Sequence, residues 1–180
     1  MNVRIIPLLG LLAIIFSSCS PTLTPFTKRL YEENRWTTSE LKRIQFYLSD
    51  NIVMRRELSG SKSEIVSGEI KLVNGRQVEE IVIPSGTPGI FMFSPKNNRF
   101  AISFEENGEE KFLMFGPNPK ANNRFVLLAS DWNRRTGKVT YAGKKYAVDS
   151  NSAFSGLMVD LQKTRQTDIN RRTARGRTVN

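Results

Sequence analysis

The sequence contains no histidine and a single cysteine, Cys19. Without histidine, the chain lacks the base of Ser-His-Asp and Cys-His systems and the commonest general base near neutral pH. The usual ligand sets of catalytic zinc, which depend on His and Cys, are excluded as well. Paired carboxylates and Ser-Lys chemistry stay open, but the chain shows no motif for either. We therefore expect a protein that is not an enzyme and that holds no metal and no diffusible cofactor.

The chain also begins with a hydrophobic run that is too short to cross a bilayer. Ile5–Phe16 has twelve residues, including a proline and a glycine, whereas a membrane-spanning helix needs about 20 apolar residues. Arg4 precedes the run, and two serines and Cys19 follow it. This order is typical of an export signal with a cleavage site directly before the thiol.

The ending Phe16-Ser17-Ser18-Cys19 resembles the lipobox of bacterial lipoproteins, although that family most often has Leu at the place of Phe16. The resemblance implies that residues 1–18 are a signal peptide and that Cys19 becomes the first residue of the mature protein. It further implies that Cys19 carries covalent lipid, namely a diacylglycerol and a third acyl chain such as palmitate. Each buried methylene group contributes about 0.8 kcal/mol, so three chains would anchor the protein permanently.

The resemblance also implies a location. In the Gram-negative family, Asp after the lipidated cysteine favours the inner membrane, and Ser20 stands there instead. We therefore expect a protein anchored in the bacterial outer membrane. Whether it faces the periplasm or the cell exterior is left open. The alternative is an ordinary secretory signal with Cys19 near the cut by chance, which would leave an unpaired thiol.

Positive charge is concentrated at the end of the chain. The formal net charge is +10, and residues 163–180 contribute +5 of it. This tail has one isoleucine, one valine and no aromatic residue after residue 163, so we predict that it is disordered. Four of its arginines are candidate partner-binding residues: Arg171, Arg172, Arg175 and Arg177. Anionic lipid, lipopolysaccharide, cell-wall carboxylates or an acidic protein would suit them, whereas the compartment argues against nucleic acid.

The composition predicts one domain between two loose ends. Residues 19–36 are interpreted as a lipidated tether, because residues 20–30 are rich in Pro, Ser and Thr. Residues 37–162 form the domain, and residues 163–180 form the tail.

The domain is predicted to begin with one amphipathic helix. Thr37 and Glu40 match a capping box, and apolar residues follow at spacings of three and four between Leu41 and Leu48. We expect a helix over Thr38–Ser49 that covers the β-domain or, alternatively, binds a partner.

After Asn51 the hydrophobic pattern changes to a period of two, which predicts an antiparallel, mainly β domain. The predicted strands are Ile52–Leu58, Glu64–Val73, Gln77–Pro84, Gly89–Phe93, Arg99–Glu106, Glu109–Phe115, Arg124–Ala129, Lys138–Tyr141, Lys145–Val148 and Ser155–Leu161. A small barrel and a two-sheet sandwich both fit, and the tight hairpins favour barrel-like closure.

Three dipeptides predict tight hairpins: Asn74-Gly75, Asn107-Gly108 and Ala142-Gly143. The second hairpin places Ile102 opposite Leu113, and the third places Val139 opposite Tyr146. Phe112 and Met114 then fall on the other face of the second hairpin, so both of its faces are partly covered.

Three surface segments are candidate sites. The loop 130–135 contains Trp132, Arg134 and Arg135, a composition enriched at interfaces, although Trp132 could instead close the end of the β-domain. The acidic hairpin tip 105–110 could bind a cation or a basic partner, or could simply be a solvated tip that discourages edge pairing. The turn 83–90 could border a pocket or only reverse the chain.

The sequence supports three hypotheses for function. The first is a non-enzymatic accessory or scaffolding subunit of a bacterial envelope assembly, with other envelope proteins as partners. The alternative is a ligand-binding β-barrel module for a lipid, glycan or peptidoglycan fragment. An enzyme that uses paired carboxylates is the third, but the sequence favours no pair.

Overall fold

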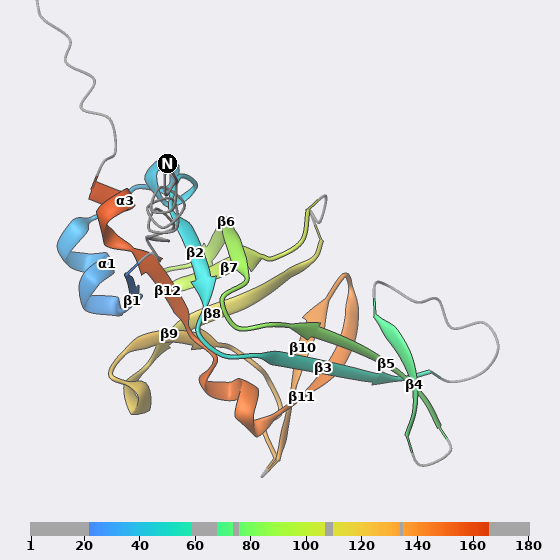
Figure 1. Cartoon of the computed structure of the whole chain (residues 1–180). Helices are drawn as coiled ribbons and strands as arrows, with labels where there is room; N and C mark the ends of the chain where they lie inside the picture. The colour runs from blue at the N-terminus through green and yellow to red at the C-terminus, as the bar shows by residue number, and fades with distance from the viewer. Residues whose placement is uncertain (1–21, 59–67, 74–75, 107–109, 134, 166–180) are drawn as a thin grey trace, which may run out of the picture.

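The computed structural model describes residues 22–58, 68–73, 76–106, 110–133 and 135–165. These residues form two antiparallel β-sheets with few helices, packed as a sandwich (Figure 1). The mainly β fold class is therefore confirmed. Within the described ranges, no helix has both the length and the apolar character that a transmembrane span requires.

The larger sheet has seven strands in the order β1-β12-β2-β6-β7-β8-β9. Their bounds are β1 Leu23–Pro25, β12 Leu157–Asp160, β2 Gln45–Leu48, β6 Pro88–Lys96, β7 Arg99–Ser103, β8 Phe112–Asn118 and β9 Arg124–Leu127. The helical segments are α1 Lys28–Asn34, α2 Thr38–Leu41, α3 Leu161–Arg165 and the 3-10 turns η1 Pro119–Ala121 and η2 Ser150–Phe154.

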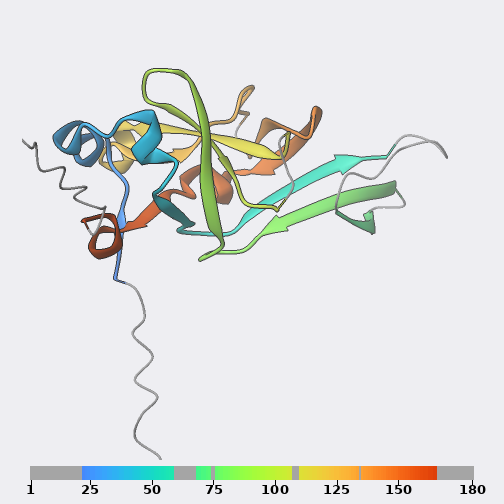
Figure 2. The same cartoon turned by 90° about the horizontal axis from the view of Figure 1, so that it is seen from above.

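The smaller sheet has five strands in the order β10-β11-β3-β5-β4. Their bounds are β10 Thr136–Tyr141, β11 Lys144–Asp149, β3 Ile52–Glu57, β5 Arg76–Ile83 and β4 Glu69–Val73. Strands β3, β4 and β5 extend away from the body as an arm (Figures 1 and 2).

The two sheets form the sandwich, and not the barrel that the tight hairpins favoured. The larger sheet nevertheless curls until its two edges touch. An isolated bridge joins Val126 of β9 to Gly156, and another joins Thr27 to Arg124. Phe26 lies between the edges, because its N–H donates to Leu157 O at 2.8 Å and its O accepts from the Phe125 N–H at 2.9 Å.

Aromatic rings fill the space inside this curled sheet. The Phe26 ring is fully buried and has five aromatic neighbours, with ring centroids between 4.9 and 6.3 Å away. These neighbours are Tyr31, Trp36, Phe46, Phe100 and Phe125. The chain's own side chains therefore fill the interior of the curled sheet.

The prediction of a tether over residues 19–36 is wrong for its described part. Residues from Leu23 onward form β1 and α1, and the Thr27 side chain caps α1 by accepting from the Leu30 N–H at 3.1 Å. The Pro- and Thr-rich composition suggested a linker, but the segment also carries Phe26, the centre of the aromatic core. Residues 19–21 lie outside the described ranges.

The predicted helix over Thr38–Ser49 is correct only in its first turn. The capping box of Thr37 and Glu40 is present, but α2 ends at Leu41. Gln45–Leu48 then forms strand β2. Ile44, Phe46 and Leu48 also fit a period of two, and burial of these alternate side chains decides in favour of the strand.

Each of the ten predicted strands overlaps an observed one, and the predicted registers are confirmed. Ile102 pairs with Leu113, and Val139 pairs with Tyr146. The dipeptides at 74–75 and 107–108, residues 64–67 and the tail residues 166–180 lie outside the described ranges. Helix α3 crosses the predicted boundary at residue 162 and ends at Arg165.

Candidate binding groove

The groove lies between strands β8 and β10, which belong to different sheets. The two chain segments are joined at one end and separate from there. At the closed end, the Ala142 N–H donates to Glu110 O at 3.1 Å. At the other end, the chain that follows β9 bridges the two strands, and the surface hollow continues beyond it, so we call this the open end. There the Leu128 N–H donates to Met114 O at 2.7 Å, and Ser130 exchanges two main-chain hydrogen bonds of 2.8 Å with Lys138.

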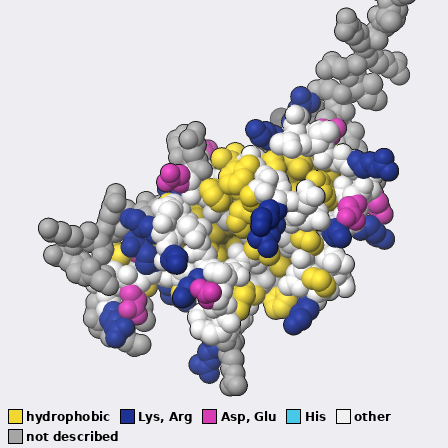
Figure 3. Space-filling model, turned by 180° about the vertical axis from the view of Figure 1, so that it is seen from behind, with side chains coloured by type: hydrophobic (Ala, Val, Ile, Leu, Met, Phe, Trp, Pro, Cys, Tyr) yellow, Lys and Arg dark blue, Asp and Glu magenta, His cyan; other side chains and the backbone are white. Residues whose placement is uncertain are grey.

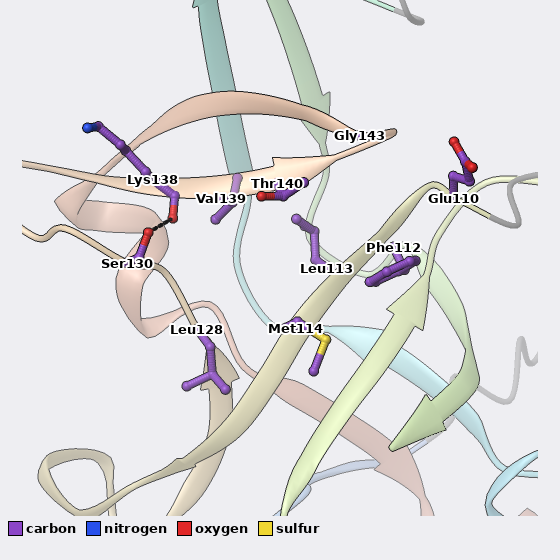
Figure 4. A pocket seen from close by; sticks show the side chains of 10 residues that line it. All are labelled: Glu110, Phe112, Leu113, Met114, Leu128, Ser130, Lys138, Val139, Thr140 and Gly143. Carbon is purple, nitrogen blue, oxygen red and sulfur yellow. Dashed lines mark hydrogen bonds between the residues drawn. The ribbon is translucent and has the colours of Figure 1, made fainter. Parts of the chain in front are cut away.

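A groove with a volume of about 470 Å³ lies between these ends (Figure 4). Two buried side chains, Leu113 of β8 and Val139 of β10, lie at its base. Half-buried Phe112, Met114 and Leu128 supply most of its apolar wall. Glu110, Ser130, Lys138, Thr140 and Gly143 complete the lining.

A second hollow of about 500 Å³ continues the groove beyond Met114 and Leu128. It adds Lys96 and Arg99, both exposed. Ion pairs within the described part of the chain involve neither of these two residues. Seen from behind, the molecule shows a patch of hydrophobic side chains with Lys and Arg side chains among and around them (Figure 3). The groove therefore combines apolar walls with a basic open end.

The predicted loop 130–135 borders the groove, but its Trp132 does not line it. The loop begins at Ser130, which is part of the lining. The Trp132 side chain is 42% exposed, and its ring packs on Gly137, where an added Cβ would lie 2.8 Å from the ring. Arg135 is exposed, whereas Arg134 lies outside the described ranges, as do the four tail arginines.

Sequence reasoning missed the residues that shape the groove. The register of the second hairpin did place Phe112 and Met114 on the face opposite Leu113, which was the available signal. What the sequence could not show is that β10 of the other sheet separates from β8 at this point. That separation turns a half-covered face into a groove.

The acidic hairpin tip does not act as one group. Glu105 accepts a hydrogen bond from the Tyr141 hydroxyl, and Lys111 Nζ lies 2.6 Å from Glu105 Oε2. Burial, and then the bond to Glu105, raises the pKa of Tyr141. Together these contacts fasten the β10–β11 hairpin to β8 at the closed end of the groove. The described residues contain no group of three or more metal-ligating side chains.

A second polar cluster lies at the base of the arm. Glu79 is fully buried, with Arg56 Nη2 2.5 Å from its Oε2 and the Tyr146 hydroxyl donating to it at 3.1 Å. The guanidinium also lies 5.6 Å from the centre of the Tyr146 ring. Burial, and then the bond to Glu79, raises the pKa of Tyr146 to about 12. The phenol therefore stays protonated, and the cluster serves to satisfy a buried charge.

The turn at 83–90 carries the chain from β5 of the smaller sheet to β6 of the larger one. Gly86 has a φ of 78° there, and its N–H donates to Leu48 O at 2.7 Å. The chain reversal is thus confirmed. The segment also lines two surface hollows of about 460 and 440 Å³, so it borders pockets as well as reversing the chain.

These features define an antiparallel β-sandwich with an aromatic core and an open groove where the two sheets part. No family model, no curated protein and no solved structure matches the chain.

Proposed function

We propose that the protein is a bacterial outer-membrane lipoprotein, anchored by lipid on Cys19, whose β-sandwich is a non-enzymatic accessory subunit of an envelope assembly. The observation that carries this proposal is the apolar groove with a basic open end, on a domain that starts four residues after the lipobox-like cysteine. Such a groove can bind a partner without any catalytic group.

The position of β1 supports a domain close to the membrane. Three residues separate Cys19 from Leu23, and the four extended steps from one to the other span at most about 14 Å. The lipid would therefore hold the sandwich near the head groups. A partner would meet the domain within the envelope, at the membrane surface.

The tail would start beside the anchor. Leu23 pairs with Asp160, which directly precedes α3, so the chain enters its basic tail from the edge of the sheet where β1 begins. Among the counterparts considered for the tail arginines, anionic lipid head groups are then the nearest. Each basic residue near an anionic membrane contributes about 1 kcal/mol of binding.

The arrangement of the titratable groups supports a role without catalysis. Glu79 is bound by Arg56, and Glu105 is bound by Lys111. These two acidic side chains are therefore committed to ion pairs within the fold, and the sequence contains no histidine to act as a general base.

The proposal is tested by purifying the full chain from Gram-negative membranes in mild detergent after reversible crosslinking. We expect defined envelope proteins to co-purify with the wild type. They should be lost with the groove variant Lys96→Glu/Arg99→Glu and retained with Lys120→Glu, since Lys120 lies in η1 at the far end of β8 and β9. Recovery of monomer alone with the wild type would contradict the proposal.

A ligand-binding module is the second candidate function. The groove volume of about 470 Å³ lies within the range of small-molecule sites, and exposed Trp132 lies close to the open end. This candidate predicts that a soluble peptidoglycan fragment or a lipid co-purifies with the protein, which native mass spectrometry would detect as a fixed added mass.

A further inference from the structure

On each wall of the groove, one residue directs its main-chain groups into the gap. Successive residues of a strand direct these groups to opposite sides. On β10, Lys138 points away from β11 and pairs with Ser130, and Ala142 points the same way and donates to Glu110. Thr140 lies between them, and within the described part of the chain its main chain has no main-chain partner on that side.

On β8, Phe112 directs its main-chain groups into the gap in the same way as Thr140 does on β10. Its neighbours Glu110 and Met114 accept main-chain hydrogen bonds from the β10 side and from the chain after β9, whereas Phe112 makes none with the described residues on this side. Glu110 pairs with Ala142. Because Phe112 lies two residues after Glu110 and Thr140 lies two residues before Ala142, Phe112 and Thr140 stand opposite each other. The gap therefore has a peptide donor and a peptide acceptor on both walls.

Such groups favour a peptide over the other possible occupants. Exposed strand edges are templates for an added strand, whose main-chain hydrogen bonds give affinity while side-chain pockets give specificity. An acyl chain in the same place would leave these polar groups without hydrogen bonds, which costs free energy. An extended peptide can satisfy both walls, since its successive residues point in opposite directions.

The side chains around the gap define the chemistry of that peptide. Phe112, Met114 and Leu128 offer an apolar surface for one or two side chains. The open end carries Lys96 and Arg99, which suit carboxylates.

We infer that the groove binds an extended peptide segment of a partner protein, with an apolar side chain against Phe112 and Met114 and acidic residues at the Lys96–Arg99 end. Main-chain hydrogen bonds to Phe112 and Thr140 hold the segment. This inference rests on the proposed accessory function and names the form of its partner.

The first test selects phage-displayed random 12-residue peptides on the purified full-length protein in detergent. We expect enrichment of sequences in which an apolar residue is followed by Asp or Glu. Binding of the selected peptide should weaken about tenfold with Lys96→Glu/Arg99→Glu, and should change less than twofold with Lys120→Glu.

The second test asks whether the main chain holds the peptide. N-methylation of either of the two peptide amides that face Phe112 and Thr140 should weaken binding about tenfold, and methylation of amides elsewhere in the peptide should not. Amide hydrogen exchange at Phe112 and Thr140 should slow when the peptide binds. Thr140→Pro, which removes an N–H that does not bond to β11, should also weaken binding about tenfold.

The inference is overturned if no peptide is enriched, or if N-methylation weakens binding to the wild-type protein at no position of the peptide. It is also overturned if a muramyl peptide or anionic lipid vesicles displace the selected peptide from the groove. These measurements do not depend on Cys19. Failure here would therefore leave the lipid anchor standing, and loss of the anchor would leave peptide binding standing.

Discussion

Phe26 lies in the segment whose composition suggested a tether, and the structure makes it the centre of the core. We expect Phe26→Ala to reduce the free energy of unfolding by about 4 kcal/mol, because deleting a buried phenylalanine ring typically costs 3–5 kcal/mol. The middle of that range is the expected loss here. The ring is fully buried, and its five aromatic neighbours cannot all move to fill the cavity.

The assay is equilibrium urea unfolding followed by circular dichroism, with the slope compared between variants. Phe154→Ala is the matched control, since the Phe154 side chain in η2 is 50% exposed and its loss should change stability by less than about 0.5 kcal/mol. A loss below about 1 kcal/mol for Phe26→Ala would refute the placement of residues 22–36 in the folded domain.

Three further predictions follow from the polar contacts. Arg56→Met should cost about 3–5 kcal/mol in urea unfolding, because Glu79 would stay buried without its guanidinium, whereas Arg76→Met, from an exposed ion pair, should cost less than about 1 kcal/mol. Because the pKa of Tyr146 is raised to about 12, its hydrogen bond contributes fully to the free energy of unfolding below pH 10, and this contribution is lost as the pH rises towards about 12. The urea midpoint should therefore fall over that interval, while absorbance at 295 nm reports formation of the phenolate. A midpoint that stays constant to pH 12 would disprove this. Thr37→Ala removes the side-chain acceptor at the start of α2 and should cost about 1 kcal/mol, measured by thermal unfolding.

The strands and their registers could be predicted from the sequence because the information is local. A strand with one face buried shows its period of two directly, and a two-residue hairpin fixes which residues stand opposite each other. The pairing of Val139 with Tyr146 follows from Ala142-Gly143 alone. The same logic placed Phe112 and Met114 on the outer face of β8.

The remaining features depend on contacts between distant segments. Ile44 and Leu48 fit a helix and a strand equally well, and only the pairing of β2 with β6 and β12 decides between them. Phe26 reaches the core because two edges of one sheet meet around it. The groove exists because strands of different sheets separate, which no local pattern encodes.

The candidate site was therefore predicted only in part. Aromatic and basic composition pointed to Trp132 and Arg135, which lie next to the groove. The groove itself is formed by half-buried apolar residues such as Met114 and Leu128, whose composition is that of an ordinary strand. The difference between a core residue and a groove residue is what covers it, and the covering element comes from another part of the chain.

The lipid on Cys19 is the central claim, and the mass of the protein extracted from Gram-negative membranes tests it most directly. The account predicts that residues 1–18 are absent and that the peptide beginning at Cys19 carries the mass of a diacylglyceryl group plus one acyl chain. Cys19→Ala should abolish both the processing and the added mass. A membrane-extracted chain with an unmodified Cys19 would contradict the account.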